Sequence, residues 1–118
     1  MIARSAAKKP APAKKAKGGI WLWTYTCKAG RLKLPDIPFG SPHYIGRFYR
    51  QMKPWIKGAY LESNSDRFLY NYMDYYVFGK VSWDNDVDLR ALFADHDRVM
   101  FGPAAKPMRE FFDILEKK

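Results

Sequence analysis

Three aspartates at alternate positions, Asp84, Asp86 and Asp88, form the pattern in this sequence that most resembles a metal-binding loop. They match the first three ligands of the calcium-binding loop of an EF-hand. The sixth position of that loop needs glycine for its turn and is Leu89 here, and the twelfth needs glutamate and is Asp95. We therefore predict no calcium site, and we interpret the aspartates as helix caps and first-turn charges.

The histidines and the single cysteine also give no metal or catalytic set. His43 and His96 have no cysteine or histidine at ligand spacing, and one cysteine, Cys27, excludes a disulfide framework. His96 stands between Asp95 and Asp97, which supplies the residue types of a catalytic dyad. Neighbours along a helix do not face each other, so we predict structural roles for both histidines. We expect neither a metal nor a cofactor.

The elements that position these residues follow from residue patterns in the first half of the chain. Residues 20–27 are aromatic and β-branched without a helical period, which predicts a buried strand. A turn-rich loop over residues 28–41 precedes a helix that Ser41 caps and Pro42 opens, ending near Met52. A second strand is predicted over residues 55–61. Strand, helix and strand over some forty residues indicate a βαβ unit with parallel pairing.

The second half of the chain is predicted to be helical. Cap residues at 63–66 precede a helix that runs to about Trp83, and residues 84–86 are predicted to cap the next one. Gly102 ends that helix and Pro103 begins the last, in agreement with the apolar period. The predicted fold class is therefore α/β, with about two parallel strands and their helices followed by a C-terminal helical segment.

The first 19 residues differ from the rest of the chain in composition. They hold Arg4 and five lysines with no acid, a charge of +6, whereas the other 99 residues hold 15 basic and 12 acidic side chains, which is +3. We predict a disordered tail over residues 1–19 and one domain over residues 20–118. The tail would contact nucleic acid, act as a solubilising extension, or reflect a misplaced translation start.

No apolar run approaches the ~20 residues of a membrane span. No apolar segment follows the early positive charges as in a secretory signal. We therefore expect no membrane contact and, by default, a cytoplasmic chain, although a longer parent protein could be secreted.

Two motifs carry a resemblance to a known family. Residues 83–88 read WDNDVD, with Tyr76 and Lys80 before them, and residues 101–105 read FGPAA. This pattern resembles the end of a bacterial domain of unknown function, number four-eight-three-eight, which is placed with α-glucuronidase-like and other glycoside hydrolase TIM barrels. The resemblance covers residues 20–118. It implies the C-terminal part of a (β/α) barrel, because a whole barrel needs eight strands and ~250 residues.

The resemblance also points to the site residues. A TIM barrel carries its active site at the C-terminal ends of its strands. Glu62, at the end of the second strand, is therefore the candidate for catalysis, and Tyr25, Asp36 and Glu62 are the candidates for ligand binding. Glu62 could equally be a solvated acid or pair with Arg47 or Arg67. Hydrolysis of a glycoside usually needs two carboxylates, so we expect an incomplete catalytic site in this chain.

The tryptophans have two interpretations. Trp21, Trp23 and Tyr25 occupy alternate positions of the first strand and therefore share one of its faces. This face would suit either stacking against a sugar or packing in a core. We expect all four tryptophans to pack against other residues of the protein: Trp21, Trp23, Trp55 and Trp83. Only Tyr25 is expected to reach a ligand.

The predicted function is that of a fragment of a carbohydrate-active, glycoside-hydrolase-like protein, inactive alone, with a carbohydrate as its partner. The alternative is a small basic protein whose tail binds nucleic acid without sequence specificity. A third interpretation is self-association through the open edges of the sheet.

Overall fold

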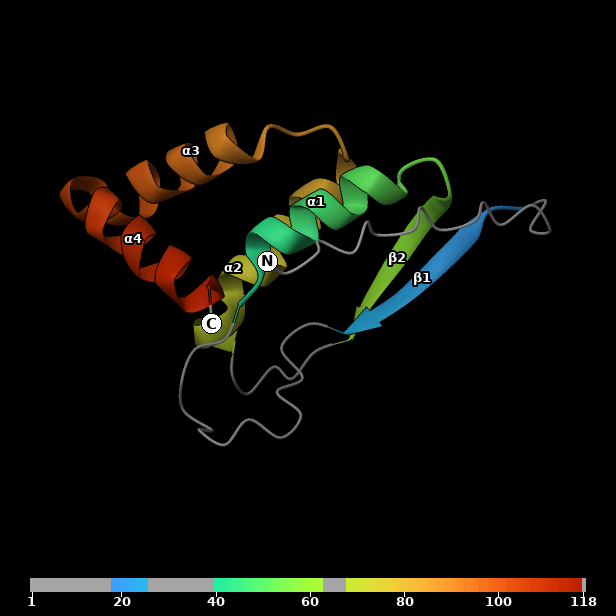
Figure 1. Ribbon diagram of the computed structural model, residues 1–118, viewed down its shortest axis with the longest axis horizontal. Coiled ribbons are helices and arrows are strands. Elements are labelled where there is room, and N and C mark those ends of the chain that lie inside the picture. The colour runs from blue at the N-terminus through green and yellow to red at the C-terminus, as the bar shows by residue number, and fades with distance from the viewer. Residues whose placement is uncertain (1–17, 26–39, 63–67, 118) are drawn as a thin grey trace, which may run out of the picture.

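The computed structural model describes residues 18–25, 40–62 and 68–117, and Figure 1 shows its elements. Their order along the chain is β1 (Ile20–Tyr25), α1 (Pro42–Met52), β2 (Ile56–Glu62), α2 (Phe68–Trp83), α3 (Leu89–Phe101), the 3₁₀ turn η2 (Gly102–Ala104) and α4 (Ala105–Glu116). The predicted tail up to residue 17, the loop at 26–39 and the caps at 63–67 lie outside the described residues.

The two strands form a parallel pair. The register runs from Ile20 opposite Ile56 to Tyr25 opposite Glu62, with one irregularity after Ile20. The prediction of a mixed α/β chain with two parallel strands is confirmed. In the described part of the chain the sheet contains these two strands, and the helices lie to one side of it (Figure 1).

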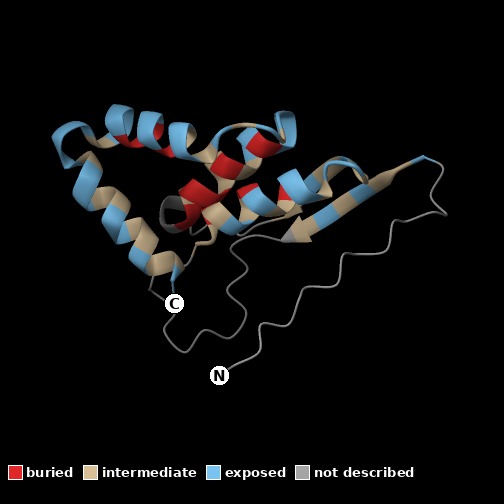
Figure 2. Ribbon diagram, turned by 45° about the horizontal axis from the view of Figure 1, so that its top comes forward, coloured by how far each residue is buried: buried red, intermediate tan, exposed pale blue. Residues whose placement is uncertain are grey.

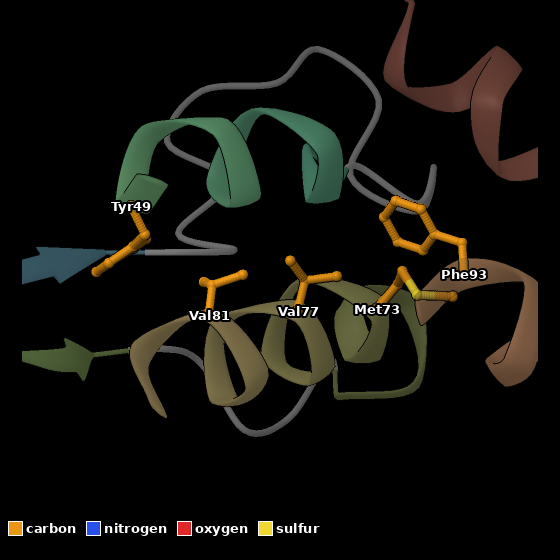
Figure 3. Packing of buried hydrophobic residues seen from close by; sticks show 5 residues of the cluster. All are labelled: Tyr49, Met73, Val77, Val81 and Phe93. Carbon is orange, nitrogen blue, oxygen red and sulfur yellow. The ribbon is translucent and has the colours of Figure 1, made fainter. Parts of the chain in front are cut away.

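The core lies between helices. Its buried members are one residue of α1, three of α2 and one of α3: Tyr49, Met73, Val77, Val81 and Phe93 (Figure 3). The three residues of α2 are four positions apart, so they form one row along the helix. Gly46 permits close packing here, because a Cβ on it would lie 2.4 Å from a methyl carbon of Leu89 at the start of α3.

The N-terminus of α1 is capped from the other end of the described chain. The predicted cap, Ser41, makes no capping hydrogen bond with its side chain. Glu116 of α4 instead accepts hydrogen bonds from the backbone N–H of Tyr44 at 3.1 Å and of His43 at 3.4 Å, and it also bonds Nδ1 of the His43 ring. Ser41 donates its own backbone N–H to Asp74 of α2 at 2.9 Å. Tertiary contacts have replaced the local cap that the sequence predicted.

Two predicted helix starts are wrong by a few residues. Asp88, rather than residues 84–86, caps α3, because its Oδ1 accepts from the N–H of Arg90 at 2.9 Å and of Ala91 at 3.3 Å. Asp86 pairs with Lys53 and thereby ties the turn before α3 to the end of α1. The last helix, α4, begins at Ala105, since Pro103 belongs to the 3₁₀ turn that follows Gly102.

A buried ionic cluster joins α3 to α4. Asp97 accepts from Arg109 at 2.6 Å and 2.8 Å, and it bonds Nδ1 of its neighbour His96 at 2.8 Å. The prediction that neighbouring side chains could not meet is wrong for this pair. Both side chains are buried, which fits the structural role predicted for His96. Burial raises the pKa of Asp97, but the hydrogen bonds from Arg109 and His96 outweigh it and hold the pKa below its usual 3.8.

The cluster predicts a large effect of Arg109→Met on stability. This change leaves the buried Asp97 carboxylate without its bidentate partner, so we expect a loss of about 3 kcal/mol in the free energy of unfolding, measured by urea denaturation. Arg98→Met is the control, because Arg98 forms an exposed pair with Asp95 that contributes about 0.5 kcal/mol or less. Equal losses in the two variants would contradict this account.

The cap on α1 predicts acid sensitivity. Burial raises the pKa of Glu116, but the hydrogen bonds from His43 and Tyr44 lower it more, so the pKa lies below the usual 4.5. A lowered pKa in the folded state gives stability above pH 4.5 that is lost as the pH falls through the folded-state value.

We therefore expect the wild-type chain to lose more of its thermal stability between pH 6 and pH 3 than Glu116→Gln does. The variant should be the less stable of the two at pH 6, by about 1–2 kcal/mol. If the melting temperatures of the two proteins fell equally between pH 6 and pH 3, Glu116 would not be the cap of α1.

Candidate functional site

The two faces of the sheet have different surroundings. Leu22 of β1 and Ala59 of β2 pack against the helical core. Successive residues of a strand point to opposite faces, so Trp21, Trp23 and Tyr60 lie on the other face. These three residues are 75%, 64% and 63% exposed, and no described strand residue is fully buried (Figure 2). We call these three side chains the aromatic sheet face.

The rings of this face have a definite arrangement. The Trp23 and Tyr60 rings meet edge to face, with centroids 5.8 Å apart and planes at 89°. Trp21 lies over Gly58 of the neighbouring strand, since a Cβ there would be 2.2 Å from the Trp21 ring. Only glycine at this position lets the indole lie that close to the backbone.

The prediction that Trp21 and Trp23 pack in a core is wrong for this chain. It rested on the usual fate of aromatic side chains in strands, which is burial in a core or against a helix. The described helices cover one side only, and this leaves the alternate residues exposed. Trp83, also expected to pack, is 94% exposed at the end of α2.

Glu62 borders the aromatic sheet face at the C-terminal ends of the strands. Its Oε2 accepts a hydrogen bond of 3.1 Å from Nε1 of Trp23. The register places Glu62 opposite Tyr25, so the parallel pairing brings two of the three predicted ligand-binding residues to one end of the sheet. The side chain of Tyr25, and all of Asp36 and Arg67, lie outside the described residues.

The described strands carry one carboxylate at this end of the sheet. Glycoside hydrolysis usually needs two carboxyl groups about 5–9.5 Å apart across the bond. Within the described strands, Glu62 is the one carboxylate. It can orient Trp23 and accept hydrogen bonds from a ligand, because a carboxylate has about four acceptor positions.

The described residues contain no group of three or more histidine, cysteine, aspartate or glutamate side chains placed to hold a metal ion. None of the described helices combines the length and the apolar character that crossing a membrane requires. Comparison with protein-family models, with curated proteins and with solved structures found no match. The resemblance of residues 83–88 and 101–105 to a glycoside hydrolase family therefore stays a prediction.

Tyr60 is the site residue that sequence reasoning missed. The signal was available, because Tyr60 and Glu62 alternate on β2 as Trp21 and Trp23 do on β1. Pairing the two alternations in register would have predicted one aromatic face ending in a carboxylate.

The contact between Trp21 and Gly58 predicts the effect of Gly58→Ala. The new methyl group displaces an exposed ring, so we expect a changed NMR shift of the Trp21 indole N–H and little loss of stability. Gly79→Ala is the control, since a Cβ there meets nothing within 4 Å and Gly79 lies inside α2. It should leave the Trp21 signal in place and stabilise the chain by about 0.5–1 kcal/mol. An unmoved Trp21 signal in Gly58→Ala would contradict the packing described.

Proposed function

We propose that this chain binds carbohydrate on the aromatic sheet face, as the C-terminal part of a glycoside-hydrolase-like protein. The observation that carries the proposal is the exposed pair of perpendicular rings, Trp23 and Tyr60, beside the Glu62 carboxylate. A sugar ring has an apolar face of C–H groups and a rim of hydroxyls. The Trp23 indole offers a surface for the C–H groups, and the Glu62 carboxylate accepts hydrogen bonds from the hydroxyls.

The arrangement of helices supports the barrel context. In a (β/α) barrel the helices surround the strands, the other face of the sheet turns inward, and the C-terminal strand ends form the rim of the active site. Here the strands are parallel and the helices lie on one side. The opposite face would be the inward one, and Trp23, Tyr25 and Glu62 would stand near its rim. Further strands would have to come from sequence outside this chain.

The charge at the site favours a neutral sugar. The Glu62 carboxylate would repel the carboxylate of a uronic acid, whereas it accepts hydrogen bonds from the hydroxyls of a neutral one. The rings of Trp23 and Tyr60 stand at right angles, so they form a corner for one sugar unit rather than a flat surface for several. We therefore propose binding of a neutral sugar unit, without hydrolysis by this chain.

A second candidate function is binding of single-stranded nucleic acid. The basic residues of the first 19 positions, which carry +6, lead into β1, where Trp21 and Trp23 follow. Exposed aromatic rings stack on bases as well as on sugars, and lysines contact phosphates without sequence preference. Glu62 counts against this candidate, because its charge repels phosphate.

The experiment is isothermal titration of the full chain with neutral hexasaccharides of glucose, xylose and mannose, with hexagalacturonate, and with a ten-residue thymidine oligonucleotide. We expect binding to at least one neutral sugar, weakened about tenfold or more by Trp23→Ala, because an aromatic at the centre of a contact carries much of its energy. Trp83→Ala is the matched control, since Trp83 is the most exposed tryptophan and lies on α2. It should bind as the wild type does.

The other outcomes are equally informative. Salt-sensitive binding of the oligonucleotide alone would favour the second candidate. Binding of no ligand by a chain that light scattering shows to be dimeric would mean that a second copy covers the face. Release of a phenol from aryl glycosides by the purified chain would contradict the proposal that this chain does not hydrolyse glycosides.

A further inference from the structure

The last helix, α4, buries little of its apolar surface. Five of its twelve residues are large and apolar: Met108, Phe111, Phe112, Ile114 and Leu115. The helix has no buried residue along its length (Figure 2). A helix this short is marginal by itself in water and depends on packing of its apolar side. Part of the apolar surface of α4 is therefore left uncovered by the described elements.

The uncovered residues form a stripe. Phe111 is 45% exposed, Ile114 is 59% exposed, and Pro107 is exposed as well. Their spacing of four and three residues places them on one side of the helix, and we call these three residues the α4 stripe. Phe112 instead faces the protein, with its ring 6.2 Å from that of Phe101. Because α1 and α2 lie between α4 and the strands in Figure 1, the α4 stripe is separate from the aromatic sheet face.

Two opposite charges border the α4 stripe. Glu110 and Lys117 are seven residues apart, which is two turns, so they lie along the same edge of the stripe. Both residues are exposed, and neither forms an ion pair with another described residue. In the heptad of a coiled coil, the α4 stripe takes the apolar a and d positions and the two charges take g positions. This is the pattern of a helix that pairs with another helix.

The partner that this pattern fits is a second α4. When two copies of one helix pair antiparallel about a two-fold axis, the same edge of both helices meets in opposite directions. Phe111 of each copy then lies beside Ile114 of the other. Glu110 of each copy lies beside Lys117 of the other, so the contact contains two ion pairs. A parallel pair would bring Glu110 against the e position, which is Leu115, and would lose this match.

We propose that α4 is a docking surface for a second copy of this chain, through antiparallel pairing of the two α4 stripes. The contact uses one helix from each copy, and interfaces of that size belong to weak and transient complexes. The proposal does not rest on sugar binding, because the pairing takes place on the other side of α1 and α2 from the aromatic sheet face.

The test is the oligomeric state of the full chain, measured by sedimentation velocity between about 5 and 500 μM, a range that suits a small interface. We expect the wild type to dimerise at the upper end of this range. Glu110→Lys and Lys117→Glu each set like charges against each other twice, so each should raise the dissociation constant about tenfold or more. One change raises the net charge of the chain and the other lowers it, so a general effect of charge cannot produce both losses.

A mixture of the two variants shows whether the charges meet between copies. In a mixed dimer every pair is again of opposite charge, so equimolar Glu110→Lys and Lys117→Glu should dimerise about as tightly as the wild type. Asp95→Lys is the matched control, because Asp95 is exposed on α3 and this change alters the net charge as Glu110→Lys does. It should dimerise as the wild type does.

Ile114→Ser tests the apolar part of the contact without a change in charge. Ile114 is exposed, so the variant should keep its helical circular dichroism and remain monomeric at every concentration. Where a charge variant does not fold, Ile114→Ser takes its place.

Four results would overturn the proposal. The first is a wild type that stays monomeric at the highest concentration. The second is a dimer that persists in Glu110→Lys or in Ile114→Ser, and the third is a mixture of the two charge variants that stays monomeric. The fourth is a dimer that is lost in Trp23→Ala, which would place the contact on the aromatic sheet face.

Discussion

The structure depends on a parallel pairing of two strands that is covered from one side only. Parallel strands require a crossover connection, and here the described part of that connection is the helix α1. With α2 packed against α1, the apolar residues Leu22 and Ala59 have a core to join. The large aromatic residues on the other face, Trp21, Trp23 and Tyr60, have no core to join among the described elements. The same pairing therefore places Leu22 and Ala59 against the helical core and leaves the aromatic sheet face exposed.

Charged side chains connect the helices where apolar burial is limited. Among the described residues the buried hydrophobic cluster has five members, so each connection between elements matters. Glu116 joins the end of α4 to the start of α1, and Asp97 joins α3 to Arg109 of α4. Both carboxylates lie in partly apolar surroundings and remain ionised because donors surround them. Their hydrogen bonds tie α4 to the start of α1 and to α3, and they predict that stability is sensitive to acid.

The sequence predicted the elements that local signals define. Pro42 and the apolar period fixed α1 within its observed bounds, and Gly102 marked the end of α3. Signals that depend on partners far along the chain were missed. Ser41 has the right residue type for a cap, but Glu116 takes that role from 75 positions away. Asp84 and Asp86 look like caps, yet Asp88 accepts from the first-turn N–H groups of α3, while Asp86 pairs with Lys53.

The candidate site was predicted in part for the same reason. Parallel pairing could be inferred from the size of the βαβ unit, and it brings Glu62 beside Tyr25. The exposure of Trp21 and Trp23 could not be inferred, because it depends on how many layers cover the sheet. A strand rich in tryptophan looks the same in sequence whether its second face meets a core or a ligand.

The central claim is that the aromatic sheet face is open and receives a sugar. Hydroxyl-radical footprinting of the full chain, with and without a neutral hexasaccharide, tests it directly. The account predicts that Trp21, Trp23 and Tyr60 are labelled readily in the free chain and are protected by the sugar, while labelling of Trp83 does not change. Slow labelling of Trp21 and Trp23 in a free monomer, or labelling that the sugar leaves unchanged, would contradict it.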